Sequence, residues 1–158
     1  MAQGPKNSIN MKTVTRAVLA MMAIGWLLVT AASAEVYETI STSELETIFK
    51  EEGYAVTVNE NGNIVWKVEG WKTLVVREKK TGSNLLFRAA VGGTQATLSK
   101  VNEWNKKVQF SRTYLDDDGD PVLELDLDLA GGVTRARIVD FLETCRVSLE
   151  RWRTHIKS

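Results

Sequence analysis

The sequence predicts an α+β domain in which helices pack on an antiparallel sheet, with elements in the order αββββαββα. Segments that alternate apolar and polar residues with a period of two indicate half-buried strands, and segments with apolar residues three and four apart indicate helices. Short turns rich in Asn, Asp and Gly separate strand pairs in both halves of the domain. Such turns join antiparallel neighbours, which predicts an antiparallel sheet.

Residues 1–34 are predicted to be an export signal rather than part of the fold. A leader with only basic charges precedes an apolar run at 17–29, which is about 13 residues long and shorter than the roughly 20 residues that span a bilayer. Small residues at 32–34 suit a signal peptidase. We therefore expect cleavage after Ala34 and a periplasmic or secreted product with no remaining membrane contact; an uncleaved anchor is the alternative.

Cleavage at that point would leave 158 − 34 = 124 residues, enough for one domain with a sizeable core. Three of the 20 basic residues lie in the leader, so 17 would remain against 20 acidic residues, a net charge of −3. This balance gives no electrostatic reason to bind nucleic acid. Cys145 is the single cysteine, so no internal disulfide can form and the core must hold the fold.

Residues 35–40 are predicted to form a short tether in front of the first helix. The Ser-Thr-Ser-Glu segment at 41–44 has the spacing of a capping box. Apolar residues then recur at helical spacing from Leu45 to Phe49, and Gly53 can take the positive φ that ends a helix. The first helix is therefore expected between Ser41 and Gly53.

Four strands are predicted after this helix, at residues 55–59, 63–68, 72–79 and 83–91. Asn61-Gly62 is a strong signal for a two-residue hairpin turn, and Glu69-Gly70 turns the chain again. Alternation places Trp66 and Phe87 on the same side of this sheet. We expect that side to face the core.

The other side of this sheet is a candidate surface for a partner chain. By alternation it mixes apolar residues with Lys and Arg, a composition that suits a contact surface. The candidate contact residues are Val65, Trp71, Val75 and Leu86. The alternative is that one of the chain's own helices covers this side.

The second half of the domain is predicted to contain a helix, a hairpin and a long final helix. The helix at 94–106 follows Gly92-Gly93, and the hairpin strands lie at 108–115 and 122–129. Thr134 can cap the final helix. Beyond it, apolar residues recur at steps of four and three as far as Ile156, which predicts one continuous apolar face.

The acidic cluster at 116–120 could suggest a cation site, but its spacing favours a turn. With Gly119 at the sixth position of a calcium-binding loop, Tyr114 would occupy the first position and Leu125 the twelfth. Both positions need oxygen donors. We therefore expect a hairpin turn, in which Asp and Gly supply local hydrogen bonds and positive φ, and no bound metal.

Carboxylates also line the following strand, where Glu124, Asp126 and Asp128 alternate with leucines about 7 Å apart. Their mutual repulsion in water is about 0.6 kcal/mol per pair, whereas burying one leucine gains roughly 1.5–3 kcal/mol. A plain solvated face is therefore the expected structure. The alternatives are an acidic docking surface or a catalytic pair drawn from Glu124, Asp126 and Asp116.

No residue set with a catalytic signature stands out. Cys145 lies on the apolar stripe of the final helix, where a thiol packs as a small hydrophobe. His155 is the one histidine, and it lies close to a helix end, a poor place for the fixed geometry that a catalytic base needs. The glycine pairs lack the spacing of a phosphate-binding loop. We therefore predict neither catalytic residues nor a cofactor.

The stretch from Val101 to Thr134 resembles the closing segment of the YbjN family of small bacterial domains, often called sensory transduction regulators. The domain is assigned to residues 41–158, and the resemblance implies a fold like that of the type III secretion chaperones. The motifs are structural in character, so they support a fold rather than an activity. The residues that carry the resemblance are Asn102, Trp104, Asn105, Phe110, Asp116, Asp118, Gly119, Gly131, Gly132 and Thr134.

The resemblance implies a non-enzymatic binding module, a chaperone-like or regulatory adaptor that holds another protein, with a second copy of itself as one option. The export signal departs from the cytosolic regulators of the family and counts against an intracellular signalling role. Two other functions remain open: a small periplasmic enzyme that uses the carboxylates, and a domain that senses a small apolar ligand between sheet and helices.

Overall fold

The computed structural model describes residues 1, 35–94 and 96–157, so the predicted export signal lies outside the described residues. The predicted α+β architecture with an antiparallel sheet is confirmed. The described elements, in chain order, are β1 (Val36–Tyr37), α2 (Thr42–Glu51), β2 (Val56–Val58), β3 (Ile64–Val68), β4 (Trp71–Arg77), β5 (Asn84–Ala90), α3 (Leu98–Lys107), β6 (Arg112–Leu115), β7 (Pro121–Asp128), β8 (Val133–Thr134) and α4 (Arg135–Lys157).

Six of the strands form one antiparallel sheet in the order β2-β3-β4-β5-β7-β6. The first four strands are joined in sequence by short turns, and β7 then inserts between β5 and β6. Phe87 on β5 lies opposite Val75 on β4 and Leu125 on β7. This row of side chains places the middle of the sheet at the middle of the core.

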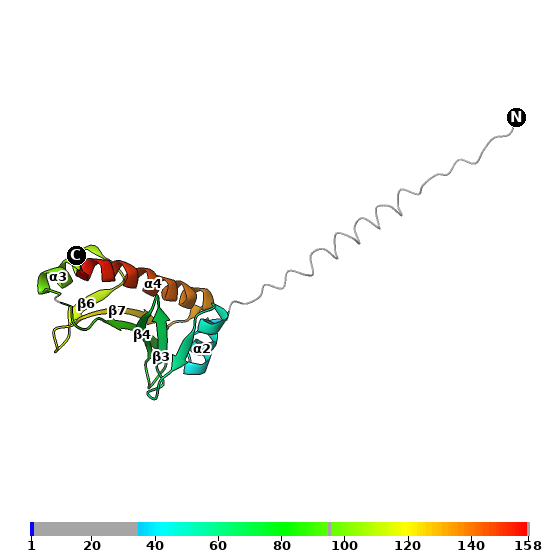
Figure 1. The fold of residues 1–158 in the computed structure, drawn as a ribbon. Coiled ribbons are helices and arrows are strands. Elements are labelled where there is room, and N and C mark those ends of the chain that lie inside the picture. Colours follow the sequence, from blue (N-terminus) through cyan, green and yellow to red (C-terminus); the bar gives the residue numbers. More distant parts are fainter. Residues whose placement is uncertain (2–34, 95, 158) are drawn as a thin grey trace. The chain divides into compact units, whose positions relative to one another are not determined.

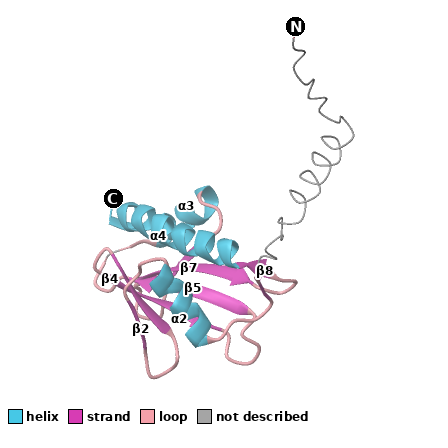
Figure 2. Ribbon diagram, turned by 90° about the vertical axis from the view of Figure 1, so that its right-hand side faces the viewer, coloured by secondary structure: helices cyan, strands magenta, loops and turns pink. Residues whose placement is uncertain are grey.

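The three described helices all pack on the same face of this sheet. Figures 1 and 2 show α4 running along that face, with α2 covering the end formed by β2 and β3. Phe49 of α2 meets Trp66 of β3 edge to face, with ring centroids 5.2 Å apart, and Trp152 of α4 is fully buried. Burying each such side chain contributes roughly 1.5–3 kcal/mol, so this helix-covered face holds most of the stabilisation.

The capping box that the sequence predicted for the first helix is present. The backbone N–H of Glu44 donates to the Ser41 hydroxyl (3.2 Å), and the N–H of Ser41 donates to the Glu44 carboxylate (2.8 Å). Hydrogen bonding to Ser41 also lowers the pKa of Glu44. Two backbone donors that a helix start leaves unpaired are thereby satisfied.

Residues 36–40 are built into the fold, so the prediction of a short tether is wrong for this segment. Val36 and Tyr37 form β1, which pairs antiparallel with β8. Ile40 is 2% exposed, and its N–H donates to the Gly82 carbonyl (3.0 Å). A segment of six residues is too short to show the periodicity that would have revealed this pairing.

The approach of β1 also explains one of the family glycines. Gly132 has φ +89°, and a Cβ atom there would lie 2.6 Å from Cγ1 of Val36. Both the backbone conformation and the close contact exclude a larger residue. The Gly131-Gly132 motif is therefore structural: it joins β7 to β8 while β1 lies against it.

Candidate functional site

The face of the sheet opposite the helices, called the open face below, carries no helix within the described part of the chain. Its centre is an apolar block formed by Val65, Leu74, Val76 and Leu86. The strand register pairs Val65 with Leu74 and Val76 with Leu86, and all four side chains are half-buried. Partly exposed apolar side chains in contact with one another mark a candidate contact surface.

Two of the four predicted contact residues lie on the open face, and two do not. Val65 and Leu86 belong to the apolar block. Val75 is 0% exposed and faces the helices, so its assignment to a partner surface is wrong. Trp71 also faces the helices, where the Arg153 guanidinium stacks 4.3 Å from its ring centroid.

The error at Val75 has a specific cause, because β4 has apolar residues in both phases of its alternation. The two-residue turn at 69–70 makes Val68 and Trp71 partners, which places Val75 beside Ile64 on the core side. Leu74 and Val76 therefore take the open face instead. Counting outward from this turn would have located them in the sequence.

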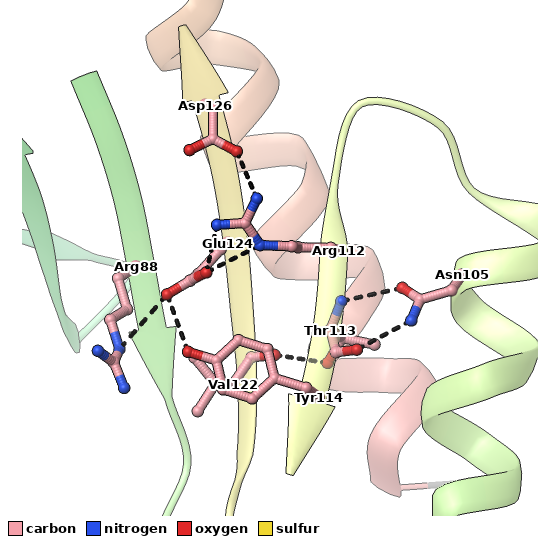
Figure 3. Close-up of polar contacts among 8 residues, drawn as sticks. All are labelled: Arg88, Asn105, Arg112, Thr113, Tyr114, Val122, Glu124 and Asp126. Carbon is pink, nitrogen blue, oxygen red and sulfur yellow. Dashed lines mark hydrogen bonds and ion pairs between the residues drawn. The ribbon is translucent and has the colours of Figure 1, made fainter. Parts of the chain in front are cut away.

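A polar cluster borders the apolar block on β5, β6 and β7 (Figure 3). Its centre is Glu124, which is only 5% exposed. Arg112 donates to one carboxylate oxygen through Nε (3.0 Å), and the Tyr114 hydroxyl donates to the other (2.9 Å). The Arg88 Nε lies 3.8 Å from that second oxygen, and Arg112 also donates to Asp126 (2.8 Å).

This arrangement makes Glu124 a fixed anion held by two cations. Its hydrogen bond raises the pKa of Arg112; burial, and then the hydrogen bond to Glu124, raises the pKa of Tyr114. Hydrogen bonds to charged groups contribute about 1.5–3 kcal/mol each. Both carboxylate oxygens of Glu124 accept hydrogen bonds from side chains of the same chain. The expected solvated stripe is therefore wrong at Glu124, although Asp126 and Asp128 are exposed.

The acidic cluster at 116–120 forms the hairpin turn that its spacing indicated. Asp116 accepts hydrogen bonds from the backbone N–H groups of Asp118 (3.1 Å) and Asp120 (2.9 Å), and Gly119 has φ +80°. Asp120 also accepts from the Gly93 N–H (3.0 Å), which ties this turn to the loop before α3. In the described residues, no three metal-binding side chains gather closely enough to hold an ion.

The family residues on α3 protect the edge of the sheet. The Asn105 side chain donates to the carbonyl of Thr113 and accepts from its N–H, both at 2.9 Å. At Thr113 the backbone N–H and C=O of β6 point away from β7, at the edge of the sheet. The Asn105 side chain gives both groups a hydrogen-bond partner. Trp104 is buried and donates from its indole N–H to the Ser111 hydroxyl (3.0 Å), whereas Asn102 is exposed.

Replacing Asn105 with Ala is expected to lower the free energy of unfolding by about 1–3 kcal/mol, because Thr113 would lose two hydrogen-bond partners at a partly buried position. Urea unfolding followed by tryptophan fluorescence measures this change. Asn102→Ala on the same helix is the matched control, and it should change stability by less than about 0.5 kcal/mol. Equal effects of the two variants would contradict the edge-protecting role.

The two potential nucleophile and base residues do not form a catalytic pair. Cys145 is fully buried, and burial raises the pKa of its thiol. A ring nitrogen of His155 lies 2.8 Å from the Lys100 carbonyl, and the ring packs against Trp104. The two residues are ten positions apart on α4, about 15 Å along the helix. This separation excludes a direct proton transfer between them.

A surface groove lies between α3 and α4, on the outer side of the helical layer. It has a volume of about 560 Å³ and is lined by Trp104, Val108, Arg151 and His155 among others. Phe110, which is 81% exposed and has φ +63°, lines a second hollow together with Val147. The space between helices and sheet, where a ligand was considered, is filled in its centre by side chains such as Trp66 and Trp152.

Comparisons with known proteins agree with this architecture. The family model named YbjN, described as "Putative bacterial sensory transduction regulator", matches residues 41–158. A solved structure entitled "Crystal structure of YbjN, a putative transcription regulator from E. coli" is similar, with a TM-score of 0.56 and 16% identity over 74% of this chain and 89% of that chain. No curated protein matches. At this identity the structural likeness concerns the fold alone.

Among the described residues, no helix combines the length and the apolar character that crossing a bilayer requires.

Proposed function

The chain belongs to the YbjN family of bacterial sensory transduction regulators, and from this premise we propose that it is an exported, non-enzymatic module that binds another protein through its open face. Its role would be that of a chaperone-like or regulatory adaptor. The family description names regulators and no enzymatic reaction. Two points go beyond that description: binding through the open face, and export from the cytoplasm.

The observation that carries the proposal is the apolar block on an uncovered sheet face. Val65, Leu74, Val76 and Leu86 remain half-buried although no described helix packs on them. A protein that covered them would remove this apolar surface from water, which gains about 25 cal/mol per Å². The charges around the block would then set the orientation of the partner rather than the affinity.

The polar cluster supports a binding role over a catalytic one. The carboxylate of Glu124 is held by Arg112, Arg88 and Tyr114, so both of its oxygens serve to order the surface. Asp116 is occupied by its own turn. The carboxylate-dependent enzyme considered from the sequence therefore gains no support from these contacts.

Export of the chain rests on its first 34 residues, which combine a basic leader, a short apolar run and small residues before Glu35. The folded part is compatible with an oxidising compartment, because its one thiol is buried in the core. We propose that the periplasmic or secreted form begins at Glu35, directly before β1.

Site-specific photo-crosslinking in living cells tests both parts of the proposal. A photoreactive amino acid in place of Val76 should give discrete crosslinked protein bands in the periplasmic fraction, because this side chain lies within the proposed contact. Intact mass of the uncrosslinked chain should correspond to a start at Glu35. The full-length mass, or a chain found only in the cytoplasm, would contradict export.

The matched control is the same substitution at Val147, an exposed valine on α4. It should give no such bands, because it lies on the helical layer away from the open face. Bands from Val147 but not from Val76 would move the binding surface to the hollow that Val147 lines together with Phe110. Absence of bands from both positions would contradict the binding role itself.

A further inference from the structure

The charges around the apolar block are arranged as a self-complementary pattern. Lys67 and Lys72 lie directly opposite each other on β3 and β4, at one corner of the block. Both are exposed, and within the described residues neither forms an ion pair. Like charges at directly opposed positions destabilise a strand pair, so this corner is suited to acidic groups from outside the domain.

Acidic groups of that kind occupy the diagonally opposite corner. Asp126 and Asp128 project from β7, and the register places Asp126 beside Leu86 of the apolar block. Both are exposed. Asp126 pairs with Arg112, and Asp128 accepts a hydrogen bond from the N–H of Ala130. Each copy of the chain therefore presents a basic corner and an acidic corner on one face.

We propose that the protein seated on the open face is a second copy of this chain, related by a twofold axis that lies in the plane of the interface. This inference rests on the proposed function and names its partner. The axis would cross the apolar block at right angles to the diagonal that joins the basic corner to the acidic corner. It would bring Lys67 onto the second copy's Asp126, and Val65 onto the second copy's Leu86.

The dimensions of a sheet support this arrangement. Strands lie about 4.8 Å apart, and residues two positions apart on a strand are separated by about 6.8 Å. On that grid Lys67 and Asp126 both lie about 10 Å from the centre of the block, so a diagonal axis exchanges them. The same operation makes the strands of the two sheets cross at about 90°, which is a known orthogonal packing of sheets.

Arg88 lies near the proposed axis, so its positive charge must be balanced for the two copies to pack there. Arg88 would lie close to the second copy's Arg88, where two bare cations would repel each other. Its side chain is, however, directed at the buried carboxylate of Glu124, with Nε at 3.8 Å. The polar cluster therefore holds this charge within its own chain and leaves the apolar block free to pack.

The size of the face determines how tight such a dimer can be. Six strands at about 4.8 Å spacing and about 17–20 Å long give a face of roughly 500 Å² per copy. This is less than the roughly 800 Å² per partner of a stable complex. We therefore expect a reversible dimer whose population depends on concentration within the micromolar range.

Sedimentation velocity of the chain purified from cells that express the full sequence tests this inference. Between about 1 and 300 µM, the sedimentation coefficient should rise from the monomer value to that of a dimer. Lys67→Asp and Asp126→Lys should each raise the dissociation constant at least about tenfold, or about 1.4 kcal/mol, because each substitution removes both symmetry-related Lys67–Asp126 contacts of the dimer. The double variant should restore dimerisation.

The control variant is Lys106→Asp on α3, which makes the same charge change on the helical layer and should leave the dissociation constant unaltered. Circular dichroism checks that each variant is folded. If a reversed charge unfolds the chain, Lys67→Gln is measured instead and should weaken the dimer as well. A monomer at every concentration, or a dimer indifferent to Lys67, would overturn the inference.

These outcomes are separable from a failure of the proposed function. A chain that stays monomeric but gives crosslinks from Val76 to a different protein would retain the binding role and reject the second copy. A dimer that survives the Lys67 substitutions would place self-association on another surface. Crosslinked bands with the mass of two chains, lost in Lys67→Asp, would support both proposals together.

Discussion

Replacing Val75 with Asp should unfold the domain. Val75 is 0% exposed and lies between Ile64 on β3 and Phe87 on β5, in the middle of the helix-covered face. An unpaired carboxylate at that position costs several kcal/mol, a large part of the roughly 5–15 kcal/mol by which a domain of this size is stable. Far-UV circular dichroism and urea unfolding should show a largely unfolded chain at 25 °C.

The neighbouring residue provides the control. Val76→Asp makes the same chemical change one position further along β4, where the side chain points to the open face and is half-buried. It should stay folded with a loss of about 1 kcal/mol or less, and it should weaken association. A folded Val75→Asp variant that has lost its partner would instead restore Val75 to the partner surface.

The thiol of Cys145 should be protected from alkylation in the folded protein. It is fully buried on α4, and burial raises its pKa, so both access and ionisation oppose reaction. Labelling by a disulfide reagent should then require unfolding, which populates about 10⁻³ of the molecules or fewer. We expect the rate at pH 8 to be at least about a thousandfold lower than in 8 M urea.

The matched control moves the thiol two positions along the same helix. Val147→Cys combined with Cys145→Ala places it at an exposed site, where it should react at the rate of a free thiol. Rapid stoichiometric labelling of Cys145 in the folded protein would contradict its burial and reopen the question of a nucleophilic role. Loss of secondary structure must be excluded in the same sample.

The same pKa shift has a consequence for stability in alkali. The folded thiol keeps its proton to a higher pH than the unfolded thiol, whose ordinary value is 9.0. The stabilisation from this pKa difference is complete below pH 9. It is lost as the pH rises further, because the thiol ionises in the unfolded state but stays protonated in the folded state, and this ionisation favours unfolding. Tyr37, whose pKa is raised to about 12 chiefly by its hydrogen bond to Glu35, acts in the same direction above pH 10.

Local features of the fold could be predicted because they depend on neighbours in the sequence. The capping box at Ser41 and Glu44 and the Asp turn at 116–120 are both formed by residues within five positions of one another. Their hydrogen bonds and φ angles follow from local chemistry. The two-residue turn predicted at Asn61-Gly62 is wrong in detail, because the loop there spans residues 59–63 and the N–H of Gly62 donates to the Asn59 carbonyl. The periodicity of apolar residues likewise identified the strands of the large sheet and the three helices.

The candidate site could be predicted only in part, because it joins strands that are not neighbours in sequence. Glu124 was expected to be solvated, and its burial depends on Arg88 from β5 and Arg112 from β6, which flank β7. No local pattern reports which strands lie beside β7. Val65 and Leu86 were assigned to the correct face, whereas Val75 was not, because β4 carries apolar residues in both phases.

By itself, the amino-acid sequence determined the type and approximate position of the main helices and strands and the resemblance to one family, because periodicity, caps and turns are local properties. The phase of β4 was also available from the sequence, because it follows from the two-residue turn at 69–70. Only the tertiary structure decided the burial of Glu124 and the docking of residues 36–40. These depend on which strands lie side by side, which is set by contacts between distant residues: β7 lies between β5 and β6, whose cations meet Glu124, and β1 pairs with β8.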